Sequence, residues 1–241
     1  MMNCLRTPCL YLLGLVLVVA SACTDPDPNN RLTKEEKEQG WTLLFDGTSA
    51  AGWHLYNKKN TTAGWIARDG ALAVDTVNKT EVNDLVSDKA YTNFDLQFEW
   101  KLSKNGNSGV FINVLERPDL TTAWASGPEY QLLDPLHADN ANPVKKAGAL
   151  FALDAQKNPV MARPAGEWNH SRIKQVNGKV EFYLNGVLTV QEDFTVPAWQ
   201  DSVSHTHFKN FPEFGKYTSG HIALQDWASG VAFRNIKIKE L

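Results

Sequence analysis

The sequence predicts an all-β fold, a single sandwich of two antiparallel sheets with one short N-terminal helix. Polar and apolar residues alternate from Phe94 to Leu102, which is typical of a strand with one buried face. Two Asn-Gly pairs, Asn177-Gly178 and Asn185-Gly186, predict tight hairpin turns. The chain has 241 residues, 43% of them apolar, and one sandwich domain commonly fills roughly 200–250 residues.

The N-terminus has the organisation of a bacterial lipoprotein signal. Arg6 precedes an apolar run over residues 10–20, about half of the ~20 residues that span a membrane. Small residues then precede Cys23, which resembles the lipoprotein cleavage motif. We expect residues 1–22 to be a signal peptide, Cys23 a lipid anchor and 23–32 a tether. The alternative is a secreted protein with a free thiol at Cys23.

These features predict an exported protein, anchored by lipid to the membrane of a bacterial cell envelope and facing the periplasm or carried on the outer membrane. Signal cleavage would remove Cys4 and Cys9, so the mature fold would depend on its core instead of a disulfide. The net charge of −3 argues against a nucleic-acid partner, which requires a basic face.

Residues 33–241 are expected to form the domain, beginning with the helix. Thr33 and Glu36 have the spacing of a capping box, and Gly40 ends the helix after fewer than two turns. The segment from Val176 to Val187 predicts a three-stranded meander with type I′ turns.

Two further strand patterns close the chain. They cover His221–Gln225 and Val231–Lys239. Within the last strand, the parity of the apolar positions changes between Phe233 and Ile236, which predicts a β-bulge between them.

Polar residues and glycines interrupt four segments that should otherwise be apolar: 105–109, 127–134, 137–139 and 225–226. One outer face of a sandwich can hold a ligand, and such residues would line it. Glu129 shares its strand face with Gln131, whereas Asp134 points to the other face. The strand therefore lacks the facing carboxyl pair of ordinary glycosidases, although Asp139 or Asp226 could supply a second carboxyl.

Histidines and tryptophans offer weaker signals. His137 and Asp139 suit a base oriented by an acid or two metal ligands, although a solvated turn is commoner. His205 and His207 have the same spacing and could also be metal ligands, but no Cys, His or carboxylate flanks them closely.

Exposed indoles can stack on sugar rings, although core packing is commoner. Five tryptophans lie in loop-like contexts: Trp53, Trp65, Trp124, Trp199 and Trp227.

A series of motifs runs in order along residues 40–241. The series comprises Gly40–Gly47 with Gly52 and Trp53, Tyr91–Leu96, Gly106–Phe111, Gly127–Asp134 with His137 and Asp139, Ala147–Leu150, Gly166–Asn169, Leu184–Gly186, Gly220–Asp226 and Phe233–Ile236. It resembles the 3-keto-disaccharide hydrolase domain family. The resemblance implies a concanavalin-like jelly-roll sandwich, in agreement with the strand patterns.

The resemblance also implies cleavage of glycosides or disaccharides already oxidised to a ketone at C3 of the sugar. A C3 ketone acidifies the C2 hydrogen, so a base can remove it while the C1 substituent leaves, and water then adds to the enone. Such a site needs a base, a group that stabilises the enolate oxygen and an acid for the leaving group. It does not need two opposed carboxylates.

The matching motifs assign expected roles to individual residues. Glu129 or His137 is the expected catalytic base, with Asp139 orienting the histidine. Lys145 or Lys146 is expected to face the enolate, unless a divalent metal stabilises it. The expected substrate-binding residues are Asn107, Gln131, Lys146, Gln225, Asp226 and Trp227. Relatives usually have His where this chain has Trp227, which could stack on the substrate.

Two other functions stay open. The first is a non-catalytic carbohydrate-binding module of the cell envelope, because lectins commonly use this sandwich. The second is an ordinary glycoside hydrolase on the same fold. Binding of unoxidised glycans without turnover would favour the first, and cleavage of an unoxidised aryl glucoside the second.

Overall fold

The computed structural model describes residues 28–59, 61–79 and 81–241. The predicted signal peptide and Cys23 lie outside these residues. The strands are β1 (Trp41–Leu43), β2 (Trp53–Leu55), β3 (Trp65–Arg68), β4 (Ala71–Val74), β5 (Leu85–Tyr91), β6 (Phe94–Leu102), β7 (Asn107–Val114), β8 (Glu129–Leu133), β9 (Asn169–Val176), β10 (Lys179–Leu184), β11 (Val187–Asp193), β12 (Gly220–Leu224) and β13 (Val231–Glu240). The helices are α1 (Lys34–Glu38), α2 (Pro197–Ser204) and the 3-10 helices η1 (Ala123–Ala125), η2 (Ala138–Ala141), η3 (Pro143–Lys145) and η4 (His207–Asn210).

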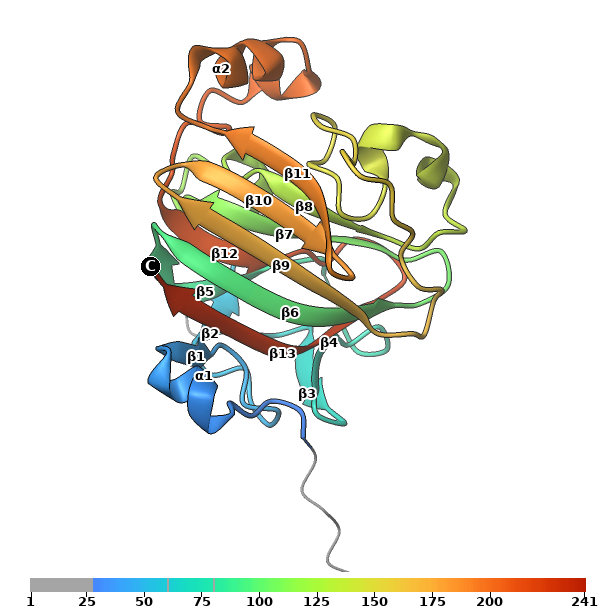
Figure 1. Cartoon of the computed structure of the whole chain (residues 1–241). Coiled ribbons are helices and arrows are strands. Elements are labelled where there is room, and N and C mark those ends of the chain that lie inside the picture. Colours follow the sequence, from blue (N-terminus) through green and yellow to red (C-terminus); the bar gives the residue numbers. More distant parts are fainter. Residues whose placement is uncertain (1–27, 60, 80) are drawn as a thin grey trace, which may run out of the picture.

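The strands form two antiparallel sheets, which confirms the predicted fold class (Figure 1). The larger sheet has the order β11-β10-β9-β6-β13-β4-β3, with β1 paired to β13. The smaller sheet has the order β2-β5-β12-β7-β8. Among the described residues, no helix is long and apolar enough to span a membrane.

Local features of the sequence explain much of this framework. The capping box of Thr33 and Glu36 is present at α1. Both Asn-Gly turns have positive φ at each residue, as type I′ turns require, so the β9-β10-β11 meander is confirmed. The pairing of β13 with β6 shifts register between Arg234 and Lys237, which confirms the predicted bulge.

Two features differ from the sequence-based expectation. The first is α2, which was not predicted. Pro197 starts it, and Trp199 and Val203 are buried one turn apart, but eight residues are too few for a clear helical period. The second is Asn30, expected in the tether. It is buried, its backbone N–H donates to Asn235 at 2.6 Å, and its side chain donates to the Gly70 carbonyl at 2.7 Å.

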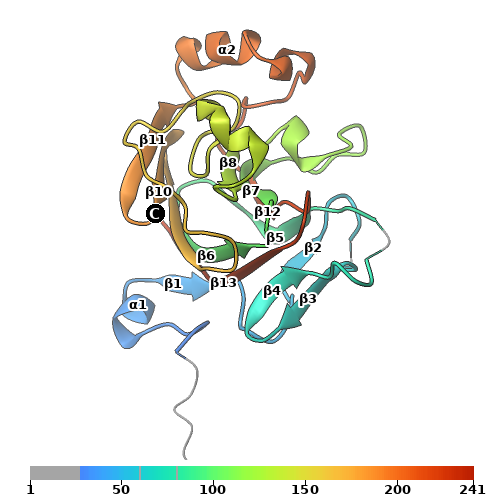
Figure 2. The same cartoon turned by 90° about the vertical axis from the view of Figure 1, so that its right-hand side faces the viewer.

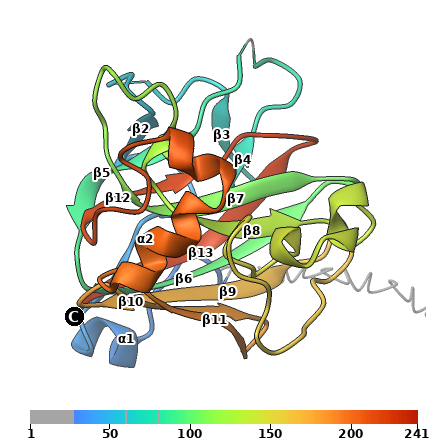
Figure 3. The ribbon, with the colours of Figure 1, turned by 90° about the horizontal axis from the view of Figure 1, so that it is seen from above.

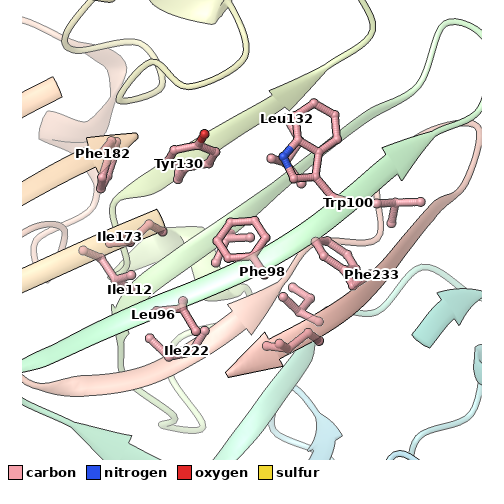
Figure 4. Packing of buried hydrophobic residues seen from close by; sticks show 14 of the residues in the cluster. Leu96, Phe98, Trp100, Ile112, Tyr130, Leu132, Ile173, Phe182, Ile222 and Phe233 are labelled. Carbon is pink, nitrogen blue, oxygen red and sulfur yellow. The ribbon is translucent and has the colours of Figure 1, made fainter. Parts of the chain in front are cut away.

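The core lies between the sheets, where the apolar faces of both meet (Figure 4). Phe98 packs edge-to-face against Tyr130 across the layers, with ring centroids 5.9 Å apart. The buried Trp100 indole donates to the Ser171 hydroxyl at 2.8 Å, and this hydroxyl also bonds the Tyr130 phenol at 2.7 Å. The indole N–H of Trp100 and the phenol oxygen of Tyr130 are thus both hydrogen-bonded inside the core.

We expect Trp100→Ala to destabilise the domain strongly. The indole is 1% exposed, and its removal leaves a large cavity that costs about 3–5 kcal/mol. For a domain of this size, this loss lowers the melting temperature by about 10 °C. Thermal unfolding followed by circular dichroism measures the change, and an unaltered melting temperature would contradict this account of the core.

The second face of the smaller sheet is covered by connecting segments. These are residues 115–128 between β7 and β8, residues 134–153 with η2 and η3, and the α2-η4 region. Figures 2 and 3 show α2 and the η2-η3 segment on the same side of the molecule as β7 and β8. The polar residues of β7 and β8 therefore lie beneath these segments.

Candidate functional site

A cavity of about 280 Å³ lies on the outer face of the smaller sheet. We call it the sheet cavity. Its floor comes from β7, β8 and the end of β12, and its walls come from the covering segments. The lining residues are Asn107, Trp124, Glu129, Gln131, Asp139, Lys145, Phe151, His207, Phe208, Gln225 and Trp227.

Strand alternation explains why polar residues reach this cavity. On β8, Tyr130 and Leu132 belong to the core, so Glu129 and Gln131 point to the opposite face. Gly109 of β7 makes room for the Glu129 side chain. A Cβ atom at position 109 would lie 2.0 Å from Glu129 Oε1.

Glu129 is the most strongly perturbed carboxyl of the sheet cavity. It is only 6% exposed. Burial raises its pKa well above the usual range, and the nearby charge of Asp84 raises it further. No hydrogen bond or basic residue of the described chain is among the causes of this shift, so nothing offsets the desolvation. Such a group, at the floor of a cleft, is a candidate for acid-base chemistry.

Asp84, which the sequence reasoning missed, is coupled to Glu129. It directly precedes β5 in a loop without a recognisable motif. Burial raises the pKa of Asp84 to about 7, the backbone N–H of Asp226 lowers it, and the charge of Asp226 raises it. That N–H donates to Asp84 Oδ1 at 3.1 Å. Burial is thus the main cause of the raised pKa of both carboxyls, and the charge of Asp84 adds to the shift at Glu129.

A second cavity, of about 360 Å³, adjoins the first. We call it the loop cavity. It shares Trp124, Gln225 and Trp227 with the sheet cavity. Its other lining residues are Tyr56, Asn57, Lys58, Val82, Asn83, Asp84, Pro118, Leu120, Thr121, Thr122 and Asp226. The three shared residues form the boundary between the two cavities.

The structure brings several of the predicted site residues together. Asn107, Glu129, Gln131 and Asp139 line the sheet cavity, and Gln225 and Trp227 line both. Asp226 lines only the loop cavity.

Backbone and ion-pair contacts hold these residues in place. The backbone N–H of Gln225 donates to the Gly109 carbonyl at 2.9 Å, which fixes Gln225 beside Glu129. The Asp226 carboxylate is 3% exposed and bonds Lys79 Nζ at 2.5 Å.

The expected histidine-aspartate arrangement is not formed. His137 caps η2, its Nδ1 accepting the backbone N–H of Asp139 at 3.1 Å, and it does not line the sheet cavity. The Asp139 carboxylate instead lies 3.2 Å from Lys145 Nζ. Of the two expected lysines, Lys145 lines the sheet cavity and Lys146 lines a separate pocket.

Aromatic residues make the walls of the sheet cavity. Of the five tryptophans in loop-like contexts, Trp53, Trp65 and Trp199 are buried core residues. Trp124 and Trp227 line the cavity, and Trp227 is 61% exposed. Two indoles therefore offer platforms for a sugar ring.

His207 also reaches the cavity wall, which no sequence pattern indicated. His205 lies apart from it and bonds the Asp201 carbonyl at 2.8 Å. In residues 28–59, 61–79 and 81–241, no group of three or more His, Cys, Asp or Glu side chains is arranged to hold a metal ion. The two histidines thus form no metal centre with neighbouring ligands in this part of the chain.

Comparison with known proteins identifies the family. The profile of the 3-keto-alpha-glucoside-1,2-lyase-like domain matches residues 40–239. The chain belongs to this family. The matched range contains both cavities and every residue assigned to them, and it confirms the resemblance read from the motifs.

Relatives of this domain include proteins from Bacteroides thetaiotaomicron and Parabacteroides distasonis. A protein from Bacteroides thetaiotaomicron named 3-keto-disaccharide hydrolase is 29% identical over 84% of this chain and 79% of its own. A crystal structure from Parabacteroides distasonis, provisionally described as a glycosyl hydrolase, is 33% identical, with a TM-score of 0.80 over 88% of this chain and 99% of its own. A second such structure from the same organism is 25% identical, with a TM-score of 0.64 over 83% and 99%.

Proposed function

We propose that the protein cleaves glycosides whose sugar ring carries a ketone at C3, by eliminating the C1 substituent. The observation that carries this proposal is Glu129, a buried carboxyl with a raised pKa at the floor of a polar cavity with aromatic walls. The membership of the 3-keto-alpha-glucoside-1,2-lyase-like family supports the substrate class.

The chemistry begins with removal of the proton at C2, which the neighbouring ketone acidifies. The ionised Glu129 carboxylate takes this proton, and the electrons of the C2–H bond form a C1=C2 double bond. The C1–O bond breaks, and the departing oxygen takes a proton from the Asp84 carboxyl. The products are an enone and the free alcohol of the leaving group. Addition of water to the enone gives net hydrolysis.

Other lining residues have supporting roles in this proposal. Lys145, beside Asp139, would stabilise the negative charge on the C3 oxygen in the enolate. The amides of Asn107, Gln131 and Gln225 would bind sugar hydroxyls, and Trp227 would stack on the apolar face of the ring. His137 has no assigned step, because it caps η2 and does not line the cavity.

The raised pKa values of Glu129 and Asp84 predict that the pH profile of kcat/KM lies at higher pH than is usual for catalytic carboxylates. The proposed step requires an ionised Glu129 and a protonated Asp84, and burial raises both pKa values, that of Asp84 to about 7. We expect kcat/KM to fall on the acidic side as Glu129 is protonated, at a pH well above the usual carboxylate range, and to fall on the alkaline side as Asp84 ionises. An acidic limb near pH 4 would contradict the raised pKa of Glu129.

A direct assay tests the reaction class. Purified protein is incubated with a 3-keto-glucoside that carries a chromogenic leaving group, with and without a chelator, and with the unoxidised glucoside as a control. We expect release from the keto-glycoside alone. Folded protein that releases nothing above buffer refutes the proposal, and cleavage of the unoxidised glucoside supports an ordinary glycosidase.

We also propose that the protein is attached to the cell envelope through Cys23, on the basis of the N-terminal sequence. In a bacterial host, the wild type should incorporate radiolabelled palmitate and sediment with membranes. Cys23→Ser should incorporate no label and appear in the soluble exported fraction. Equal labelling of both proteins would contradict the anchor.

A further inference from the structure

Asp226 is among the expected substrate-binding residues, but its carboxylate already has a partner in the folded chain. The residue is 3% exposed, and Lys79 Nζ donates to its Oδ1 at 2.5 Å. On its other side, the backbone N–H of Asp226 donates to Asp84 Oδ1 at 3.1 Å. Asp226 therefore connects the ammonium group of Lys79 to the carboxyl that donates a proton in the proposed reaction.

An ordered turn after β4 presents Lys79 to Asp226. The Asp75 carboxylate accepts the backbone N–H groups of Val77 and Asn78, each at 3.2 Å, and the Asp75 carbonyl accepts the backbone N–H of Lys79 at 3.1 Å. An aspartate that bonds the backbone in this way stabilises a turn. The Lys79 side chain is 21% exposed, so it reaches Asp226 largely beneath the surface.

We propose that Asp226 is a positioning residue for Asp84, held in place by Lys79, and not a substrate-binding residue. The inference rests on the proposed function, in which Asp84 donates a proton to the departing oxygen. The Asp226 backbone fixes the Asp84 carboxyl against the end of β12. Asp226 and Lys79 then act on the reaction only through Asp84.

The two charges of this ion pair act on Asp84 in opposite directions. Burial is the main cause of the raised pKa of Asp84, the backbone N–H of Asp226 lowers it, and the negative charge of Asp226 raises it. A variant without the Asp226 charge should therefore have a lower pKa at Asp84. A variant without the nearby Lys79 cation should have a higher one, because the field of Asp226 is then no longer balanced.

The other titratable groups that face Asp84 come from β8 and from the end of β2. They are Glu129, whose pKa is raised by the charge of Asp84, and Tyr56, whose backbone N–H donates to the Asp84 carbonyl at 2.9 Å. Burial raises the pKa of Tyr56 to about 12, so its phenol is neutral where Asp84 titrates. Lys58 also lines the loop cavity, but it pairs with Glu81 at 2.7 Å. These four groups provide the background against which the ion pair is tested.

The test titrates Asp84 directly by NMR, in protein labelled with carbon-13 at the aspartate carboxyl carbons. Asp84→Asn identifies the signal. Asp226→Asn removes the negative charge and keeps the backbone N–H, whereas Lys79→Gln removes the positive charge and keeps a donor for Asp226. The matched control is Glu81→Gln, which neutralises an ion-paired carboxylate between Lys79 and Asp84 in the sequence, paired with Lys58.

We expect the titration midpoint of Asp84 to move to lower pH in Asp226→Asn and to higher pH in Lys79→Gln, each by up to about one unit. The control should keep the wild-type midpoint. With a 3-keto-glycoside, kcat/KM at pH 9 depends on the fraction of Asp84 that is still protonated. It should fall by up to about tenfold in Asp226→Asn and rise in Lys79→Gln, while kcat/KM at pH 5 stays close to that of the wild type.

Midpoints that are equal in the wild type and both variants, or an equal shift in the control, overturn the inference and leave the proposed function standing. An equal loss of kcat/KM at pH 5 and pH 9 in Asp226→Asn, with an unshifted midpoint, also overturns it, because Asp226 would then act on the substrate. A wild type that cleaves no keto-glycoside refutes the proposed function, and the titration still decides whether the ion pair controls Asp84.

Discussion

Glu129→Gln should reduce kcat/KM for a 3-keto-glycoside by about a thousandfold, within the range typical of a lost general base. The amide has nearly the same shape as the carboxyl but cannot accept the C2 proton. The variant should fold, because the native carboxyl is buried and gains nothing from a charged partner in the described residues.

The stability of this variant provides an internal check. The folded state raises the pKa of Glu129, so folding favours the protonated form. The wild type therefore loses stability as the pH rises above the unfolded value of about 4.3 toward the folded value. Glu129→Gln lacks this loss and should be the more stable protein at pH 8. Denaturant unfolding at pH 5 and pH 8 measures the difference.

Two controls separate a catalytic effect from a general one. Glu99→Gln makes the same chemical change on the larger sheet, where Glu99 pairs with Arg234, and should keep most activity. His137→Ala removes the other base expected from the sequence and should also keep most activity. Full activity in Glu129→Gln, or a loss of activity in His137→Ala alone, would mean that Glu129 is not the catalytic base.

Gly109→Ala should reduce activity by about a hundredfold while leaving the backbone of β7 intact. The added Cβ would lie 2.0 Å from Glu129 Oε1, so the carboxyl must move. Cδ and Cγ of Glu129 would also lie 2.7 Å from the new Cβ, so most of this buried side chain must shift. The backbone itself accepts alanine, because φ at position 109 is not in the left-handed region. A displacement of about 1 Å in a catalytic group can cost about a hundredfold in rate.

The control for this variant loses stability and not activity. Gly40→Ala introduces alanine at a φ of +86°, where no atom lies within 4 Å of the new Cβ. It should lower the unfolding free energy by about 1 kcal/mol through backbone strain and leave kcat/KM unchanged. Wild-type activity in Gly109→Ala would show that the position of Glu129 on the sheet is not critical.

The fold was predictable where the chain has a regular period or a specific turn chemistry. The alternation of β6, the Asn-Gly turns around β10 and the parity change in β13 each correspond to an observed element. The helix α2 was not predictable in this way, because it is short and its burial depends on Trp199 packing against Phe194 and Phe214. Such tertiary contacts leave no period in the sequence.

The site was predictable only in part, for a related reason. Glu129, Gln131 and Asn107 follow from strand alternation and family motifs. Asp84 comes from a loop and His207 from the 3-10 helix η4, and both approach the sheet only in the folded chain, so no local pattern indicates them. His137 has a suggestive spacing to Asp139, but it serves as a helix cap.

The fate of the C2 hydrogen tests the central claim most directly. A 3-keto-glycoside carrying deuterium at C2 is incubated with the protein in ordinary water, and the sugar product is examined by mass spectrometry and NMR. We predict that the product has lost the deuterium and that kcat/KM shows a primary isotope effect. A product that retains deuterium at C2, released without an isotope effect, would contradict proton abstraction at this position.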